Sequence, residues 1–497
     1  MSSDAPLFIG IPGASVPLAP EVAGAKAAQL SRISVLGLPV PPAFVLPTIL
    51  CGPVNQGDHA ALIALDRGLR DGVARLEMAT GRRFGDSRAP LLVSVRSGAA
   101  QSMPGMLDTI LDVGLNARSV RGLIGLTGNP RLAWDSYRRF IRGYAEVVEN
   151  TPSAPFDECL SKMIEAEGVA READLDPEAL ERLAAQFLAI AADAAGRPIP
   201  EDPLDQLGAA ARAVYHSWES PRAQHYRRLN NLSNLAGTAV AIQAMVFGNA
   251  GGRSGAGVAF SRNPATGAKE LYVDFLFDAQ GEDVVAGRRM AGDDRLLAAR
   301  LPEAAAALAE GAARLEREFR DVQDIEFTIE EGRLFFLQAR PAKRAPRAAL
   351  RILVDLVSEG VLDPATAHER AARIDPESAR ITRFASPARA VATAVSASPG
   401  VASGRVAFDS ARAGALSAAG DPVILVRHET STDDVAGFAV AAGILTAVGG
   451  RTAHAAVVAR GLGKVCLVGC RDLSIDEGRA SGTIAGNRIA EGDWISL

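Results

Sequence analysis

A histidine near the end of the chain lies where a phosphoryl group could be held. An apolar run at 443–448 and two glycines precede His454, a pattern that predicts a strand, a turn and a helix with Thr452 as its N-cap. The unpaired amides and positive dipole end of a helix N-terminus stabilise an anion, so an imidazole there could carry phosphate as a covalent intermediate. A hydrogen-bonded structural histidine is the commoner role for such a residue, so support must come from elsewhere in the chain.

A hairpin predicted over 324–340 offers ligands for a nucleotide and its metal ion. Strand side chains alternate between faces, so Asp324 and Glu326 share one face, and Gln338 and Arg340 share a face of the return strand. Magnesium on a nucleoside triphosphate prefers hard oxygen ligands, which Glu326 and Gln338 supply. Arg340 could neutralise a transferring phosphate. An exposed hairpin with cross-strand ion pairs is an equally good interpretation of these residues alone.

Further cations are candidates for contacting phosphate. Lys26 lies at the start of a predicted helix, Arg96 at the end of a predicted strand, and Arg138 and Arg139 form an adjacent pair. Each alone is typical of a solvated surface charge. The chain has no Gly-x-x-x-x-Gly-Lys-Ser/Thr sequence, so a P-loop fold is disfavoured.

The elements that must position these residues form several folding units. Apolar residues after Asp176 repeat every three or four positions, as in an amphipathic helix, whereas 91–95 and 238–246 are apolar runs of strand length. From about 201 onward strands are expected to return. The predicted boundaries are 1–116 with 201–345 for a mixed α/β domain, 117–200 for a helical insertion, 346–390 for a helical connector, and 391–497 for a final α/β domain.

The composition narrows the classes of partner. The 497 residues carry a net charge of -5 and 48% hydrophobic residues, which suits three or four packed units. No polybasic block occurs, which argues against nucleic acid or an anionic membrane as the main partner. The N-terminus has no signal-peptide pattern, and we expect a cytoplasmic protein. Four cysteines are too few for a disulfide framework.

Nine short segments together match the motifs of one family. The chain resembles the N-terminal and central portions of the pyruvate phosphate dikinase family over nearly all its length. The resemblance implies an α/β multidomain fold: an ATP-grasp nucleotide-binding domain with a helical insertion, followed by a swivelling α/β phosphohistidine domain. The segments that carry it are 37–42, 93–99, 102–106, 134–140, 226–230, 243–249, 279–287, 324–340 and 449–461.

The resemblance also implies roles for the candidate residues. Lys26 and Arg96 correspond to cations that contact the phosphates of ATP. His454 corresponds to the histidine that is phosphorylated, and Thr452 to its neighbouring threonine. The other implied roles are cradling of the adenine for Gln243, Met245 and Val246, nucleotide and Mg²⁺ binding for Asp324, Glu326 and Gln338, and contact with inorganic phosphate or pyrophosphate for Arg340 with Arg138 or Arg139.

Two departures from the family pattern affect the expected reaction. The family has Gly-Ala-Arg-Ala-Ser-Met-Pro-Gly where residues 98–105 read Gly-Ala-Ala-Gln-Ser-Met-Pro-Gly, so one basic side chain near the phosphates is missing. This puts the phosphate acceptor in doubt. The sequence also stops at Leu497, where the family continues into a (β/α) barrel that binds pyruvate or phosphoenolpyruvate.

The resemblance implies a dikinase component that phosphorylates His454 with ATP and inorganic phosphate and releases AMP and pyrophosphate. The phosphoryl group would pass to pyruvate or another small acceptor on a separate barrel subunit, and a homo-oligomer is compatible with the sequence. In one alternative, water replaces phosphate, as in relatives that resemble phosphoenolpyruvate synthase. In another, the chain is a non-catalytic module in which ATP only sets domain orientation. An experimental truncation of a full-length dikinase also fits.

Overall fold

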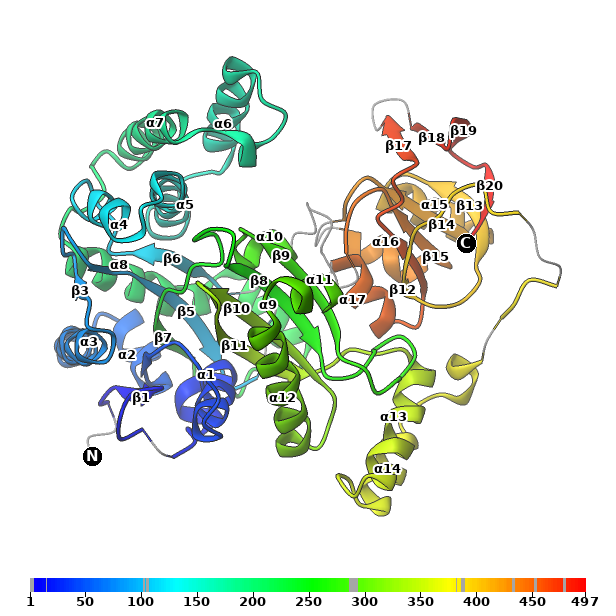
Figure 1. Cartoon of the computed structure of the whole chain (residues 1–497), viewed down its shortest axis with the longest axis horizontal. Helices are drawn as coiled ribbons and strands as arrows, with labels where there is room; N and C mark the ends of the chain where they lie inside the picture. Colours follow the sequence, from blue (N-terminus) through cyan, green and yellow to red (C-terminus); the bar gives the residue numbers. More distant parts are fainter. Residues whose placement is uncertain are drawn as a thin grey trace. The chain divides into compact units, whose positions relative to one another are not determined.

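The computed structural model describes residues 4–14, 16–101, 103, 107–285, 294–380, 382–385, 389–430, 434–450, 454–476 and 480–497. The chain divides into two compact units, Met1–Val246 with Phe335–Gln338, and Phe247–Leu334 with Ala339–Leu497. Its elements can be followed by label and colour in Figure 1. Each unit has its own sheets and core, which agrees with the expected α/β multidomain class.

The first unit is built on a five-stranded antiparallel sheet. The central strand β5 pairs with β7 on one side and β6 on the other. Because β7 pairs with β5 throughout, β5 runs to Ala99, one residue beyond the expected strand end at 96–98. The strands, in spatial order, are β1 (Leu7–Ile9), β2 (Ala43–Leu46), β7 (Thr238–Ala244), β5 (Val93–Ala99) and β6 (Thr109–Val113).

Helices cover this sheet, and one of them lies unusually close to it. In α1 (Pro20–Val35), Gly24 has a φ of 77°, and a Cβ there would lie 2.1 Å from the carbonyl oxygen of Gly98. Only glycine permits this approach of the helix start to β5. The other elements of the sheet region are η1 (Thr48–Leu50), α2 (Cys51–Asn55), α3 (His59–Thr80), the β3 (Arg83–Phe84) and β4 (Pro90–Leu91) pair, α8 (Pro203–His216), η3 (Ser217–Glu219) and α9 (Pro221–Leu229).

The predicted helical segment is helical in the structure. The side chain of Asp176 accepts a hydrogen bond from the amide of Ala179, and Gly196 ends the helix in the left-handed conformation. Phe156 and Phe187 pack edge to face with ring centroids 5.0 Å apart, which joins two helices of the segment. These helices lie together in Figure 1: α4 (Ser119–Thr127), α5 (Pro130–Val148), α6 (Ala154–Glu167), η2 (Glu172–Asp174) and α7 (Pro177–Ala195).

The second unit contains the predicted hairpin within a four-stranded sheet. β10 pairs antiparallel with β8, and β8 with β9. Strands return after residue 201, as we expected, and the helices α8, α9 and α12 (Pro302–Phe319) share that region. The elements are β8 (Gly255–Phe260), β9 (Tyr272–Phe277), α10 (Gly281–Val285), α11 (Asp294–Arg300), α12 (Pro302–Phe319), β10 (Gln323–Glu330) and β11 (Arg333–Pro341), with sheet order β11-β10-β8-β9.

The first helix of the predicted connector belongs to this core. Ile352 and Leu356 of α13 (Pro346–Ser358) are buried in one apolar cluster with Val258 and Tyr272. The side chain of Arg262 is fully buried and links β8 to neighbouring helices: its guanidinium donates to Glu316 at 2.7 and 3.0 Å and to Glu359 at 2.7 Å. α14 (Pro364–Ala371) and η4 (Pro376–Ala379) follow.

The last part of the second unit is a six-stranded sheet with helices. Its four central strands are parallel, as expected where helices connect successive strands. The sheet order is β12 (Val395–Ser398), β16 (Val465–Val468), β15 (Gly443–Thr446), β14 (Val423–Arg427), β13 (Ser403–Ala407) and β20 (Trp494–Ser496), with α15 (Ser410–Ala418), α16 (Val435–Val440), α17 (His454–Gly461), and a small sheet of β17 (Leu473–Asp476), β18 (Ser481–Ile484) and β19 (Asn487–Ala490).

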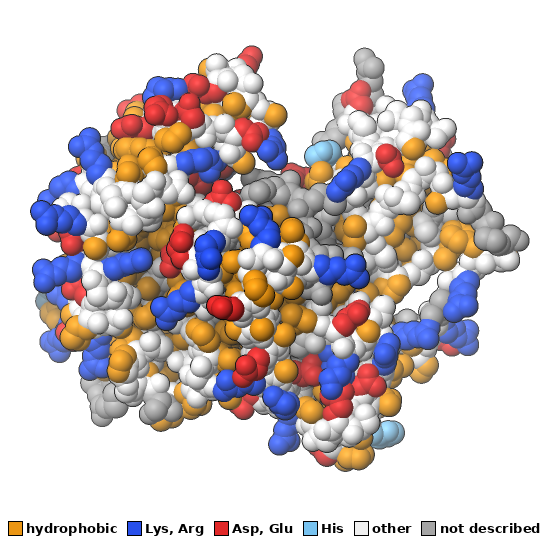
Figure 2. Space-filling view, in the orientation of Figure 1, with side chains coloured by type: hydrophobic (Ala, Val, Ile, Leu, Met, Phe, Trp, Pro, Cys, Tyr) orange, Lys and Arg blue, Asp and Glu red, His pale blue; other side chains and the backbone are white. Residues whose placement is uncertain are grey.

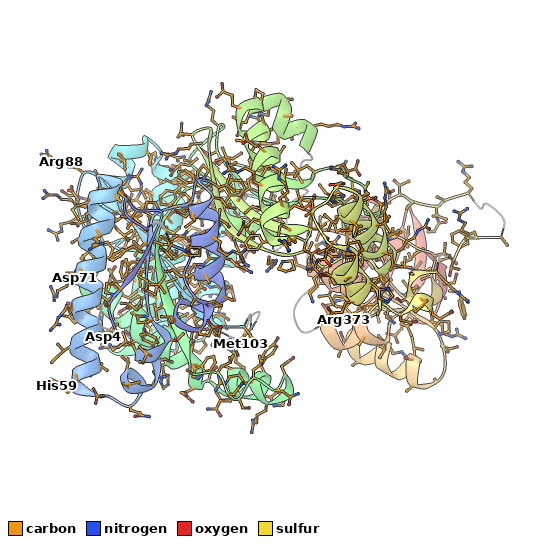
Figure 3. All side chains as sticks on the ribbon, turned by 90° about the horizontal axis from the view of Figure 1, so that it is seen from below. Asp4, His59, Asp71, Arg88, Met103 and Arg373 are labelled. Atoms are coloured by element: carbon orange, nitrogen blue, oxygen red, sulfur yellow. The ribbon has the colours of Figure 1, made fainter. Side chains whose placement is uncertain are left out.

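Two general features complete the fold. Among the described helices, none has both the length and the apolar character needed to cross a membrane. All four cysteines are free; Cys159 is partly exposed, whereas the other three are buried. His59 begins α3 and is exposed, and Asp71 lies farther along the same helix (Figure 3).

Candidate functional site

A narrow pocket in the first unit brings four of the predicted residues together. It is lined by Lys26 from α1, Arg96 from β5, Gln243 from β7 and Gln338 from β11. The close approach of α1 to β5 at Gly24 places the helix start beside the strand that carries Arg96. The enclosed volume is about 20 Å³, far less than a nucleotide occupies, so a nucleotide would lie across the mouth of the pocket.

Two polar atoms in this pocket lack partners. Arg96 Nε and Gln243 Nε2 are buried and make no hydrogen bond to any described residue. Burying such groups unsatisfied costs about 1–3 kcal/mol each. Native proteins seldom tolerate that cost without a ligand or water nearby. The pocket therefore has the donors that a phosphate or an adenine would satisfy.

Met245 and Val246 follow directly after β7 and are partly exposed. The amide of Met245 donates to the carbonyl of Leu92 at 2.9 Å, so the segment continues alongside the preceding sheet region. Neither residue lines the pocket with Gln243. Their predicted role with adenine stays a prediction.

The hairpin presents its charged residues in the second unit. Arg340 Nε donates to Asp324 Oδ2 at 2.8 Å, and Arg340 Nη2 lies 3.7 Å from Glu326 Oε1. Asp324 is buried, whereas Glu326 and Arg340 are partly exposed. Both faces of β10 are largely covered, so the alternative of an exposed hairpin was wrong. The cross-strand ion pairs of that alternative are present, but they involve the buried side chain of Asp324.

Burial gives Asp324 an unusual protonation equilibrium. Desolvation raises the pKa of this carboxyl above its usual value, and the charge of Arg340 opposes that rise only in part. Glu326 adds to the rise because its negative charge disfavours a second one nearby. A cation bound here would relieve both effects.

The hairpin carboxylates fit a hard divalent cation. Asp324 Oδ1 is buried and has no hydrogen-bond partner among the described residues, which leaves an oxygen available as a ligand. Within the part of the chain that the structure describes, no cluster of three or more His, Cys, Asp or Glu side chains forms a ready-made metal cage. Magnesium in nucleotide sites commonly takes one or two carboxylates and completes its shell with phosphates and water. The donor set agrees with that pattern.

Arg138 and Arg139 lie in α5 and are engaged by carboxylates. Arg138 Nη2 donates to Asp135 Oδ1 at 2.6 Å, and Arg139 Nε donates to Asp135 Oδ2 at 3.0 Å. Glu172 of η2 pairs with both guanidinium groups. Neither arginine lines the pocket that contains Lys26. Sequence reasoning missed Glu172 because it is 33 residues from Arg139, and it missed Asp135 as a partner although the i, i+4 spacing pointed to it.

The predicted strand before the two glycines and the predicted helix at His454 are both present. β15 precedes it, α17 starts at His454, and Gly463 follows in the left-handed conformation. Ala456 and Ala459 of this helix are buried. The side chain of His454 and all of Thr452 lie outside the described residues, and so does most of the loop at 102–106 apart from the buried Met103 (Figure 3).

Comparisons with known proteins agree with these observations. A family model described as "Pyruvate phosphate dikinase, AMP/ATP-binding domain" matches residues 63–301 and 293–359. A second, described as "PEP-utilising enzyme, mobile domain", matches residues 419–497. The first match alone spans more than half of the chain.

Curated proteins of the same family are similar along almost the whole chain. Pyruvate, phosphate dikinase of Clostridium symbiosum is 45% identical over 484 residues, which cover 95% of this chain and 55% of that protein. The chloroplastic pyruvate, phosphate dikinase of Flaveria trinervia is 45% identical over 478 residues, 95% of this chain and 50% of that protein. The chain thus spans about half the length of these relatives, and by these matches it belongs to the pyruvate phosphate dikinase family.

Proposed function

We propose that this chain catalyses the histidine-phosphorylating half of a dikinase reaction. A nitrogen of the His454 imidazole attacks the β-phosphorus of ATP, and AMP leaves. Inorganic phosphate then takes the terminal phosphoryl group, which departs as pyrophosphate and leaves one phosphoryl group on the histidine. The products balance ATP, phosphate and histidine against AMP, pyrophosphate and phosphohistidine.

The unpartnered Arg96 Nε in the first-unit pocket is the observation that carries this proposal. A buried guanidinium Nε without a hydrogen-bond partner among the described residues is suited to an oxyanion, and Lys26 lines the same pocket. In phosphoryl transfer the protein contributes mainly positioning and charge neutralisation, which is what these two cations offer. Gln243 Nε2 adds a neutral donor for the nucleotide.

The hairpin residues serve the phosphates and their metal ion in this proposal. Asp324 and Glu326, with Gln338, would hold Mg²⁺, which would neutralise charge on the phosphates of ATP. Arg340 donates a 2.8 Å hydrogen bond to Asp324, which partly offsets the effect of burial on that carboxyl, and it has a partly exposed guanidinium for a departing phosphate. Thr452 would assist as the residue that caps the helix of His454.

The acceptor of the phosphoryl group belongs to the same proposal. Relatives named pyruvate, phosphate dikinases are about twice as long as this chain, so the acceptor site would lie on a barrel outside these 497 residues. Pyruvate, or another small molecule, would receive the phosphoryl group there, on a separate subunit. The domain that contains α17 would move between the two sites on the segment that follows α14.

A second candidate replaces phosphate by water. The observation that favours it is Ala100, at the position where the family has a basic residue. One phosphate-binding charge fewer lowers the affinity for a free dianion. In this case the terminal phosphoryl group of ATP would leave as inorganic phosphate.

Labelling with ATP that carries ³²P in its β-phosphate tests both candidates. Wild type should acquire acid-labile label with Mg²⁺, His454→Ala should acquire none, and His428→Ala, changed in the same domain, should behave as wild type. ATP labelled in its γ-phosphate separates the two candidates. Release of that label as pyrophosphate, only when phosphate is added, supports the dikinase reaction, whereas its release as inorganic phosphate without added phosphate supports water as acceptor. Full labelling of His454→Ala, or none of the wild type despite bound ATP, would contradict the proposal.

A further inference from the structure

The cluster around Arg138 contains one carboxylate that is placed as an oxyanion would be. Glu172 Oε1 lies against Nη2 of Arg138 and 3.6 Å from Nη2 of Arg139, so a single oxygen bridges two guanidinium groups. Phosphate is commonly bound by such paired guanidinium groups. The carboxylate occupies the geometry that one phosphate oxygen would take.

Glu172 is also the member of the cluster that can leave. Its side chain is 27% exposed, whereas those of Asp135 and Arg138 are 5% and 4% exposed. The backbone beneath it is held independently, because Arg131 donates to the carbonyls of Ala173 and Leu175 at 2.8 and 3.2 Å. Rotation of one glutamate side chain would therefore uncover the two arginines without moving η2.

The charges favour a doubly negative replacement. Arg138 and Arg139 pair with the carboxylates of Asp135 and Glu172, and the charge of Arg131 also acts on Asp135. Departure of Glu172 removes one negative charge from beside these guanidinium groups, whereas a phosphate dianion would bring two. Asp135 stays as a fixed charge: burial alone would raise its pKa, but the surrounding guanidinium groups outweigh that and hold the pKa below its usual value.

Arg138, the buried arginine of the cluster, also has a hydrogen-bond donor that no described residue uses. Arg138 Nε is buried and has no hydrogen-bond partner among the described residues. A carboxylate has two oxygens for this cluster, whereas phosphate has up to four. Phosphate could therefore satisfy donors that Glu172 leaves unsatisfied.

We propose that Glu172 is an internal competitor for inorganic phosphate, and that phosphate binds between Arg138 and Arg139 by displacing this side chain. The inference rests on the proposed function in one respect, which is that the phosphate bound here is the co-substrate. Glu172 acts as a regulator of affinity and touches no reacting atom. It sets the phosphate concentration at which the site fills.

Calorimetric titration of the full chain with inorganic phosphate, without nucleotide or Mg²⁺, tests this exchange. Glu172→Gln should bind phosphate about tenfold more tightly than wild type, a gain of about 1.4 kcal/mol. Glu181→Gln, changed at an exposed site on α7, should match wild type. The double variant Glu172→Gln with Arg139→Gln should lose this gain in phosphate affinity. Circular dichroism of each variant checks that the helices persist.

The outcomes separate this inference from the proposed function. Equal phosphate affinity of folded Glu172→Gln and wild type would overturn the exchange, whether or not His454 is labelled. Tighter binding by Glu172→Gln supports it, even if no labelling occurs and the proposed function fails. Titration with a non-hydrolysable ATP analogue forms a second arm. If Glu172→Gln binds only the ATP analogue more tightly than wild type does, the site belongs to the nucleotide, and the inference for inorganic phosphate is overturned.

Discussion

At the scale of single residues, Asp135 is the centre of the arginine cluster. Its two oxygens accept separate hydrogen bonds from Arg138 and Arg139, and it is buried with Arg138. Buried ion pairs are not strongly stabilising in themselves, but removing one member leaves uncompensated charge in a region of low polarity. The fold of α5 against η2 should therefore depend on this carboxylate.

Asp135→Asn should lower the free energy of unfolding of the first unit by about 3–5 kcal/mol. Urea denaturation followed by the fluorescence of the neighbouring Trp134 measures it. Asp157→Asn, which removes an exposed partner of Arg142, is the matched control and should change stability by less than about 1 kcal/mol. Similar losses in both variants would contradict the role given to Asp135.

The lowered pKa of Asp135 also fixes the direction of a pH effect. Because the pKa is lower in the folded chain than in the unfolded chain, the stabilisation is fully present above the ordinary aspartate range. It is lost as pH falls through the lowered folded value. The difference in stability between wild type and Asp135→Asn should therefore shrink on acidification. A difference that grows toward low pH would contradict this assignment.

At the scale of elements, the helices and strands with strong local signals could be predicted from the sequence. The hairpin, α7 with its Asp176 cap and the strand before His454 were confirmed, because their apolar spacing and turn residues leave few alternatives. α12 was not predicted, although its buried residues Leu308, Ala312 and Leu315 recur at helical spacing. The site pairings also could not be predicted, since Glu172 meets Arg139 only through tertiary packing.

Helix α13, at the start of the predicted connector, also owes its position to tertiary packing. α13 reads as an amphipathic helix that could link two domains, yet its apolar face completes the core over β8 and β9. Arg262→Ala should release it, because Glu316 would keep a buried charge without its partner. Hydrogen exchange of 346–358 should rise at least about tenfold while β5 keeps its protection. Arg351→Ala, at an exposed site on α13, should leave exchange unchanged.

At the scale of the whole molecule, charge is divided unevenly along the chain. Residues 151–200 contain ten acidic and four basic residues, a net charge of -6, while the complete chain carries -5. The rest of the chain is therefore close to neutral. Asp and Glu side chains gather over α6 and α7 (Figure 2). An anionic nucleotide would meet repulsion mainly from these helices, so salt should affect its binding to the remaining surface only weakly.

Limited proteolysis should locate the part of the connector that trypsin reaches first. Arg380, Arg383 and Arg389 are exposed and lie after the last regular helix of the connector, whereas Arg347 and Arg351 lie within α13. Trypsin should cut first at one of the former three and release a C-terminal fragment that begins at residue 381, 384 or 390, as identified by mass spectrometry. Early cleavage within 346–371 would mean that α13 is not firmly packed.

The unequal burial of the four cysteines makes the chain suited to selective labelling. Burial raises the pKa of Cys51 to about 11 and that of Cys466 to about 12, so their thiols resist alkylation at neutral pH, and Cys470 is buried too. Cys159 of α6 is partly exposed. A maleimide dye should therefore attach there without any cysteine being removed by mutation. The natural chain thus has a single fluorescent reporter position on the helices that carry its acidic surface.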